Sequence, residues 1–188
     1  APGKIYWLVN DGEENFSLDD TKTISLEGIK INSNPSSILK DLDNDGDQDI
    51  YLPTDKGVFW FENLGTGFSD SIQVTSGSTQ NANSNDSYAA DMDGDGDIDI
   101  ISAHLGQDLI AWHENDCKQT DCWDGSVRPG FTYQKVVKGH TNGPNGPWSI
   151  YAKDINGDGH MDVLSTSQHD DELAWYRNDG AEDPSFTY

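Results

Sequence analysis

The sequence predicts an all-β fold built from β-propeller blades, and three observations carry this prediction. Similar acidic segments recur as DLDNDGDQDI, DMDGDGDIDI and DINGDGHMDV, beginning at Asp41, Asp91 and Asp154. A second landmark, Trp followed three residues later by Asn, begins at Trp7, Trp60, Trp112 and Trp175. Hydrophobic residues make up 34% of the chain but include 6 Trp, 7 Tyr and 6 Phe, which favours aromatic β-sheet packing over a Leu-rich helical core.

Short β-prone runs lie between these landmarks. Residues 50–54, 100–104 and 163–167 follow the acidic segments, and each run leads through a polar turn into an aromatic run that ends in the Trp segment. A further run follows each Asn, at residues 16–24, 68–74, 131–137 and 186–188. Each unit therefore has about four strands, which is typical of a propeller blade, and no apolar spacing of three and four indicates helices.

The order of the landmarks divides the chain into blades of one propeller domain. If the acidic loop joins the first and second strands, the Trp segment is the third strand. We then expect a half blade at residues 1–34 and blades at residues 35–84, 85–146 and 147–188, about three and a half in all. Closed propellers have four to eight blades. We therefore expect further blades from a longer chain or from another copy.

The acidic segments predict three calcium sites. Calcium takes six to eight hard oxygen ligands, and alternating Asp residues before a glycine can wrap around such an ion. The seventh residue of each segment varies, which is expected if it contributes its backbone carbonyl. The candidate ligands are Asp41, Asp43, Asp45, Asp47 and Asp49 in the first segment, Asp91, Asp93, Asp95, Asp97 and Asp99 in the second, and Asp154, Asn156, Asp158, His160 and Asp162 in the third.

Other interpretations of these segments fit less well. An EF-hand needs a bidentate Glu at its twelfth position, where this chain has Leu52, Ser102 and Ser165. Simple solvated Asp/Gly turns would not explain why the same spacing recurs three times. Magnesium prefers to keep its waters and is rarely held by all-protein ligands. Without a cation, carboxylates about 4 Å apart would repel each other by roughly 4 kcal/mol at an effective dielectric of 20.

The three D-x-[DN]-x-D-G-x-x-D segments and the recurrent WFEN, WHEN and WYRN segments resemble the FG-GAP/VCBS repeat family, and the resemblance covers nearly the whole chain. This family occurs in integrin α-subunit propellers, fungal propeller lectins and many secreted proteins. The resemblance implies a calcium-stabilised propeller with each ion held in the hairpin between the first two strands of a blade. The chain departs from the family pattern because its opening half blade lacks an acidic loop.

Charge, cysteine content and sequons predict an extracellular protein that does not bind nucleic acid. The formal net charge is −23, which repels phosphates and anionic lipid head groups. Cys117 and Cys122 suit a small local disulfide in an oxidising compartment, with two free thiols as the alternative. Sequons at Asn15 and Asn85 agree with secretion as a glycoprotein. The sequence has no run of 18 or more apolar residues, so we expect no insertion into a membrane.

The sequence favours a binding or structural role over catalysis. The five histidines do not recur at equivalent positions, and the paired carboxylates are already assigned to calcium. We therefore expect no enzyme, but an extracellular structural or adhesive module that engages proteins, glycans or further copies of itself. A lectin, or an accessory domain of a secreted polysaccharide-degrading enzyme, is the alternative. Trp148, in a loop rich in turn-forming residues, is a candidate ligand contact, and the repeated Trp residues serve a lectin only if they are exposed.

Overall fold

The computed structural model describes residues 3–31, 39–75, 83–116, 130–138, 144–181 and 184–188. Its strands form three four-stranded antiparallel sheets and one two-stranded sheet, which we call blades. This confirms the predicted all-β class with blade-like sheets. The described residues contain no α-helix and one short 3₁₀ turn, η2 (Leu105–Gln107), and no described helix is long and apolar enough to cross a membrane.

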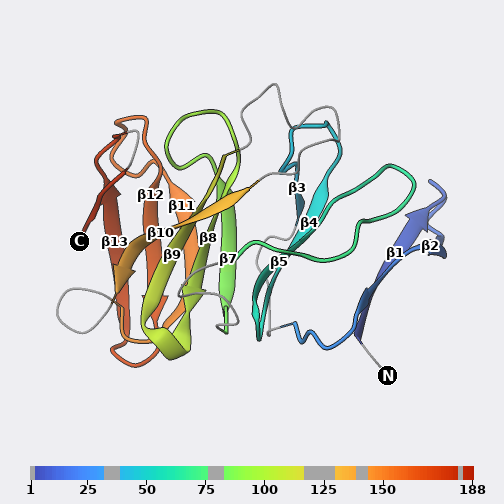
Figure 1. Cartoon of the computed structure of the whole chain (residues 1–188), viewed down its shortest axis with the longest axis horizontal. Coiled ribbons are helices and arrows are strands. Elements are labelled where there is room, and N and C mark those ends of the chain that lie inside the picture. The colour runs from blue at the N-terminus through green and yellow to red at the C-terminus, as the bar shows by residue number, and fades with distance from the viewer. Residues whose placement is uncertain (1–2, 32–38, 76–82, 117–129, 139–143, 182–183) are drawn as a thin grey trace.

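Blade 1 is the half blade that the Trp landmarks predict. It consists of β1 (Gly3–Asn10) and β2 (Phe16–Leu26), which pair antiparallel across a tight turn. Because β1 carries Trp7 and ends at Asn10, it corresponds to a third strand and β2 to a fourth. In Figure 1 this hairpin stands at one end of the row of sheets.

Blades 2 to 4 each have the strand order first, second, third, fourth. Blade 2 contains β3 (Leu39–Lys40), β4 (Asp49–Thr54), β5 (Gly57–Phe61) and β6 (Ile72–Gln73). Blade 3 contains β7 (Asp86–Ala90), β8 (Asp99–His104), β9 (Leu109–Asn115) and β10 (Phe131–Lys138). Blade 4 contains β11 (Pro147–Lys153), β12 (Asp162–Ser167), β13 (Glu172–Asn178) and β14 (Phe186–Thr187).

The predicted second, third and fourth strands agree closely with these bounds, and the largest difference lies in the fourth strand of blade 2. The sequence pattern predicts a strand over residues 68–74, whereas β6 covers Ile72–Gln73, and Phe68 makes an isolated bridge to Asn63. The backbone N–H of Ser69 donates to the carbonyl of Glu62, and the backbone N–H of Glu62 donates to the hydroxyl of Ser69. These two bonds hold the turn between β5 and β6 together. The first strands carry no landmark of their own, and the sequence pattern did not locate them.

The hydrophobic core lies between neighbouring blades. One face of each blade packs on the opposite face of the next, as when Tyr51 and Trp60 of blade 2 meet Ala89 and Ile100 of blade 3. Equivalent clusters join blade 1 to blade 2 and blade 3 to blade 4. The alternation of side chains along each strand therefore serves two interfaces at once, which explains why β4 and β8 are buried along their whole length.

Candidate metal centres

The three acidic segments form hairpin loops at one rim of blades 2, 3 and 4. Loop 1 (residues 41–49) joins β3 to β4, loop 2 (residues 91–99) joins β7 to β8, and loop 3 (residues 154–162) joins β11 to β12. Each loop thus connects the first and second strands of its blade. Loop positions one to nine are counted from the first Asp of each loop.

The first Asp of each loop holds the turn by its own carboxylate. Oδ2 of Asp41, Asp91 and Asp154 accepts a bond from the backbone N–H of the sixth residue at 3.0, 3.1 and 2.9 Å. That sixth residue is a glycine with φ between 93° and 98°, a left-handed conformation that side chains disfavour. The glycine in the motif is therefore required by backbone geometry.

The ninth Asp of each loop ties the hairpin to the third strand. Asp49, Asp99 and Asp162 are fully buried, and each accepts two backbone bonds. Oδ2 accepts from the second residue of the loop at 2.9 to 3.2 Å, and Oδ1 accepts from the Asn of the Trp segment at 2.7 to 2.9 Å. Because a carboxylate offers about four lone-pair sites, these bonds leave acceptor capacity for a cation.

Loops 1 and 2 concentrate carboxylates. In loop 1 one oxygen each of Asp41, Asp43 and Asp49 lies within 4.8 Å of the others, and Asp91, Asp93 and Asp99 form the same cluster in loop 2. Charges this close repel by roughly 3 kcal/mol per pair at an effective dielectric of 20. Among the described residues, the acidic loops form one ion pair, which joins Arg177 to Asp158 of loop 3.

The pKa values of the clustered carboxyls reflect burial and mutual repulsion. Burial, followed by repulsion from Asp49 and Asp45, raises the pKa of Asp43 to about 7. Burial raises the pKa of Asp99 to about 8 even though two backbone N–H groups oppose the shift. The pKa values of Asp49, Asp93 and Asp97 rise to about 6, again mainly through burial. These carboxyls therefore sit where a bound cation would offset the cost of their charge.

One buried oxygen in loop 1 has no hydrogen-bond donor. In loops 2 and 3, Oδ1 of the first Asp accepts a bond from the fourth residue, Gly94 or Gly157, at 2.7 Å. Loop 1 has Asn44 at this place, and Oδ1 of Asp41 is buried without a hydrogen bond. An orphaned carboxylate oxygen beside two further carboxylates is a suitable donor for a hard cation.

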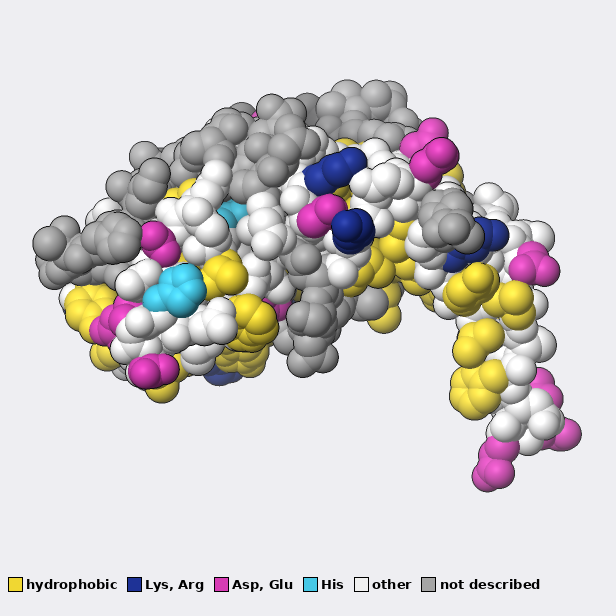
Figure 2. Space-filling view, turned by 90° about the horizontal axis from the view of Figure 1, so that it is seen from below, with side chains coloured by type: hydrophobic (Ala, Val, Ile, Leu, Met, Phe, Trp, Pro, Cys, Tyr) yellow, Lys and Arg dark blue, Asp and Glu magenta, His cyan; other side chains and the backbone are white. Residues whose placement is uncertain are grey.

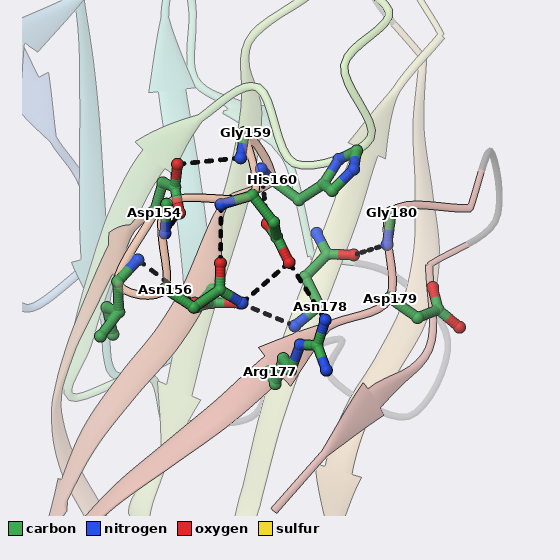
Figure 3. Close-up of polar contacts among 12 residues, drawn as sticks. Asp154, Asn156, Gly159, His160, Arg177, Asn178, Asp179 and Gly180 are labelled. Atoms are coloured by element: carbon green, nitrogen blue, oxygen red, sulfur yellow. Dashed lines mark hydrogen bonds and ion pairs between the residues drawn. The ribbon is translucent and has the colours of Figure 1, made fainter.

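Loop 3 has the same backbone but a weaker concentration of charge (Figure 3). Its third residue is Asn156, whose amide donates to Oδ2 of Asp158 at 2.8 Å, and Arg177 donates to the same oxygen at 3.3 Å. The backbone N–H of His160, with these contacts, lowers the pKa of the exposed Asp158. The amide of Asn156 and the guanidinium of Arg177 therefore partly offset the charge of the predicted ligands in loop 3, whereas among the described residues no cationic side chain pairs with loops 1 and 2.

The seventh-position side chains point in different directions. His160 packs against the backbone of Gly180, in the turn after the third strand, and Asp47 lies near the corresponding Gly65. Asp97 is buried instead, and its carboxylate accepts a bond from Asn44 of loop 1 at 3.1 Å. This variety is compatible with a ligand role for the seventh backbone carbonyl, and it adds a contact between loops 1 and 2 that the sequence pattern did not reveal.

The Asn of the Trp segment has a role that the sequence pattern did not assign. Nδ2 of Asn115 donates to the carbonyls of Ile98, in its own loop, and Leu42, in loop 1, at 3.0 and 2.8 Å. Asn178 makes the corresponding bonds to Met161 and to Met92 of loop 2. Asn115 and Asn178 thus each link the acidic loop of their own blade to the acidic loop of the preceding blade. The recurrence of Asn at a fixed spacing after Trp was the sequence signal that could have indicated this role.

The other candidate residues lie away from the loops. Trp60 and Trp112 are fully buried, so they offer no sugar platform, whereas Trp175 and Trp148 are 42% and 45% exposed. Trp148, with Thr166, Ser167 and Gln168, lines a cavity of about 280 Å³. Asn15 is exposed in the β1–β2 turn, but Ser87 of the second sequon is buried in β7. Cys117 and Cys122 lie outside the described residues.

Blade 3 also buries a polar group of three that the sequence did not single out. The hydroxyl of Ser102 lies 2.8 Å from Nε2 of His104 and 3.0 Å from Nε2 of His113, and all three side chains are fully buried. Burial lowers the pKa of His104 to about 4 and that of His113 to about 3. Both histidines are therefore neutral members of the core, inaccessible to a substrate.

Comparison with known proteins agrees with this architecture. Residues 41–102 match the profile of the FG-GAP-like repeat, which confirms the expected resemblance over loops 1 and 2. No curated protein matches the chain. Among solved structures, a lectin of Agrocybe aegerita, described as specifically recognising non-reducing terminal N-acetylglucosamine, is similar with a TM-score of 0.60 and 18% identity. The similarity covers 97% of this chain and 45% of the lectin chain, and it shows a shared fold.

Proposed function

We propose that this chain is an extracellular, calcium-stabilised propeller module with a structural or adhesive role, engaging other proteins or further copies of itself. The observation that carries the proposal is the pair of carboxylate clusters in loops 1 and 2. Their buried members have raised pKa values, and within the described residues no Lys, Arg or His pairs with them. A folded state with such clusters is most stable when a divalent cation neutralises them.

The donor set fits calcium. Each loop offers hard carboxylate or amide oxygens at positions one, three, five and nine, and a backbone carbonyl at position seven. In loop 1 the ion would be held by Asp41, Asp43, Asp45 and Asp49, and the orphaned Oδ1 of Asp41 would gain a partner. Once bound, calcium would supply positive charge and rigidity to the hairpin. Loop 3 would hold a third ion through Asp154, Asn156, Asp158 and Asp162.

An extracellular location agrees with this chemistry. Calcium modules outside cells work with dissociation constants of about 10⁻⁴ to 10⁻³ M, because extracellular calcium is abundant. An exposed loop such as loop 3 is compatible with dissociation constants in that range. The net charge of −23 keeps the module soluble and away from nucleic acid and anionic lipid.

Thermal and denaturant unfolding with calcium and with excess chelator tests the proposal. One ion per site at about 100 times its dissociation constant adds about 2.7 kcal/mol to the free energy of unfolding. We therefore expect chelation to lower the unfolding midpoint of the whole chain, and Asp43→Asn to reduce the calcium effect. Asp20→Asn, an exposed change on β2, is the matched control. A midpoint that does not respond to chelator would refute the calcium role.

Glycan binding is a second candidate function, favoured by the cavity beside Trp148. An exposed indole face next to the hydroxyls of Thr166 and Ser167 and the amide of Gln168 is a suitable surface for a sugar ring. The cavity lies at the rim opposite loop 3, because Trp148 is the second residue of β11 and Ser167 ends β12. The sugar recognised by the similar lectin suggests the first probe.

Calorimetric titration with an oligosaccharide that ends in N-acetylglucosamine tests this candidate. We expect binding that Trp148→Ala abolishes while the calcium response stays intact. Leu64→Ala, which changes an exposed apolar side chain in the turn after β5, is the control and should leave glycan binding unchanged. If the wild-type protein does not bind this oligosaccharide, the glycan-binding candidate is wrong.

A further inference from the structure

A repeated aromatic contact joins neighbouring blades. The Phe after the third strand of one blade packs on the Trp in the third strand of the preceding blade. Phe68 lies 5.7 Å from Trp7, and Phe131 lies 6.3 Å from Trp60, between ring centroids. Phe186 likewise packs against the cluster that contains Trp112. The pattern predicts one such Phe and one such Trp for every blade.

Two members of this pattern have no partner of the other kind in the described structure. Phe16 of blade 1 is 63% exposed, and Trp175 of blade 4 is 42% exposed, whereas Trp60 and Trp112 are 0% and 1% exposed. Blade 1 and blade 4 stand at opposite ends of the row of sheets (Figure 1). One end therefore presents the Phe half of the contact, and the other end presents the Trp half.

Both exposed aromatic rings lie within larger apolar faces. Around Trp175, the pairing of strands places Tyr151, Leu164 and Trp175 in one row, and Leu173 beside them is 70% exposed. In blade 3 the equivalent Ile101 and Trp112 are buried by blade 4. The Trp175 face is thus the same surface that each preceding blade uses to receive its neighbour.

The opposite face belongs to the β1–β2 hairpin. Leu8 pairs with Leu18 beside Phe16, and these side chains, with Tyr6, are 46% to 63% exposed. Figure 2 shows apolar side chains gathered on this projecting hairpin. Exposed apolar surface of this kind marks an interaction site in a soluble protein.

Charge is complementary between the two ends. On blade 4 the basic Lys153 and Arg177 are exposed at the loop 3 end of the Trp175 face, where Arg177 also pairs with Asp158. On the hairpin the exposed Asp11, Glu13 and Glu14 form the turn that precedes Phe16. The two ends can therefore approach each other with local attraction in a chain whose overall charge would otherwise oppose association.

We propose that these two faces join copies of this chain head to tail, with Trp175 of one copy packed against Phe16 of a second copy. The proposal rests on the self-association included in the proposed function and identifies its surfaces. It extends between copies the contact that already joins the blades within the chain. Because the two surfaces differ, the interface is heterologous, and two copies can close on each other if their rotation allows it.

Size-exclusion chromatography with light scattering, in calcium and over a concentration series, tests the contact. We expect wild-type protein to reach the mass of two chains, and Phe16→Glu or Trp175→Glu alone to reduce it to one. Both side chains are exposed, so neither change opens the core, and circular dichroism checks that the sheets remain. Leu64→Glu, an exposed apolar change in the turn after β5, is the matched control and should associate like wild type.

Mixing the two variants decides the head-to-tail arrangement. Phe16→Glu keeps an intact Trp175, and Trp175→Glu keeps an intact Phe16, so an equimolar mixture should recover a complex of two chains. Wild-type protein that stays at the mass of one chain would overturn the proposed contact. A mixture that stays at one chain would also overturn it. In either case the calcium response of the unfolding midpoint still reports separately on the proposed function.

Discussion

Blades 3 and 4 share the same loop backbone but differ in how their loops carry charge. In loop 2, Asp91, Asp93 and Asp99 converge, and burial raises the pKa of Asp99 to about 8. In loop 3 the backbone N–H of His160, with the side chains of Asn156 and Arg177, lowers the pKa of the fifth residue, Asp158. The spacing of the motif therefore determines the hairpin, while the third residue and the burial of the loop determine how strongly its carboxylates repel one another.

The two blades also differ in their cores and outer faces. The position of His113 in blade 3 is taken by Tyr176 in blade 4, and that of His104 by Ser167. Both faces of β9 are buried, whereas alternate residues of β13 are exposed. The same repeat therefore forms blade 3, which is covered on both faces, and blade 4, which has one face exposed to solvent.

The largest expected effect concerns the ninth Asp, where the two blades are alike. Asp162→Ala would leave one buried and one partly buried backbone N–H group without an acceptor, and we expect a loss of about 3 kcal/mol in the free energy of unfolding measured in chelator. Asp99→Ala should cost less in chelator, because it also removes a carboxylate that repels Asp93. Urea denaturation measures both. Asp162→Ala at wild-type stability would contradict the bracing role.

The buried histidines should make blade 3 sensitive to acid. Their folded pKa values of about 3 and 4 lie below the ordinary value near 6.5, so the unfolded chain binds more protons and stability falls as pH drops below 6.5. At pH 5 each histidine should cost about 2 kcal/mol. We expect wild type to lose more stability than His113→Gln between pH 7 and pH 5 in urea denaturation. Equal losses would show that His113 does not carry the effect.

Exchanging the third residues should exchange the calcium affinities of the two loops. Asn156→Asp gives loop 3 the same carboxylates as loop 2 at positions one, three, five and nine, and we expect about tenfold tighter calcium binding there, equivalent to about 1.4 kcal/mol. Asp93→Asn is the reciprocal change and should weaken loop 2 by a similar factor. Calcium titration calorimetry measures both. Affinities that stay unchanged would mean that charge count does not set the difference.

The smallest effect is expected from the ion pair of loop 3. The pair between Arg177 and Asp158 is largely exposed, so Arg177→Ala should change the free energy of unfolding by less than about 1 kcal/mol. Its removal should tighten calcium binding at loop 3 slightly, because a competing cation has gone. Glu114→Ala, at the equivalent position in blade 3, provides the comparison. A larger loss of stability would assign the pair a structural role.

The amino-acid sequence by itself determined the repeat, the strand order and the candidate ligands. Asp and Gly at fixed spacing specify a local hairpin, since the first Asp and the sixth Gly interact across five residues. The acidic segments, the Trp segments and the Phe residues at blade spacing likewise indicate where the second, third and fourth strands lie. Interactions of this kind depend on residues close together in the chain, so a single sequence reveals them.

Tertiary structure alone decided which equivalent residues differ in environment. Asn115 reaches the carbonyl of Leu42 across 73 residues, and Asn44 reaches Asp97 across 53, so no local pattern could show these links between loops. The same holds for Trp112 and Trp175, which occupy one motif position but are buried and exposed respectively. The physical reason is that burial, and with it pKa and accessibility, depends on which blade packs against which face.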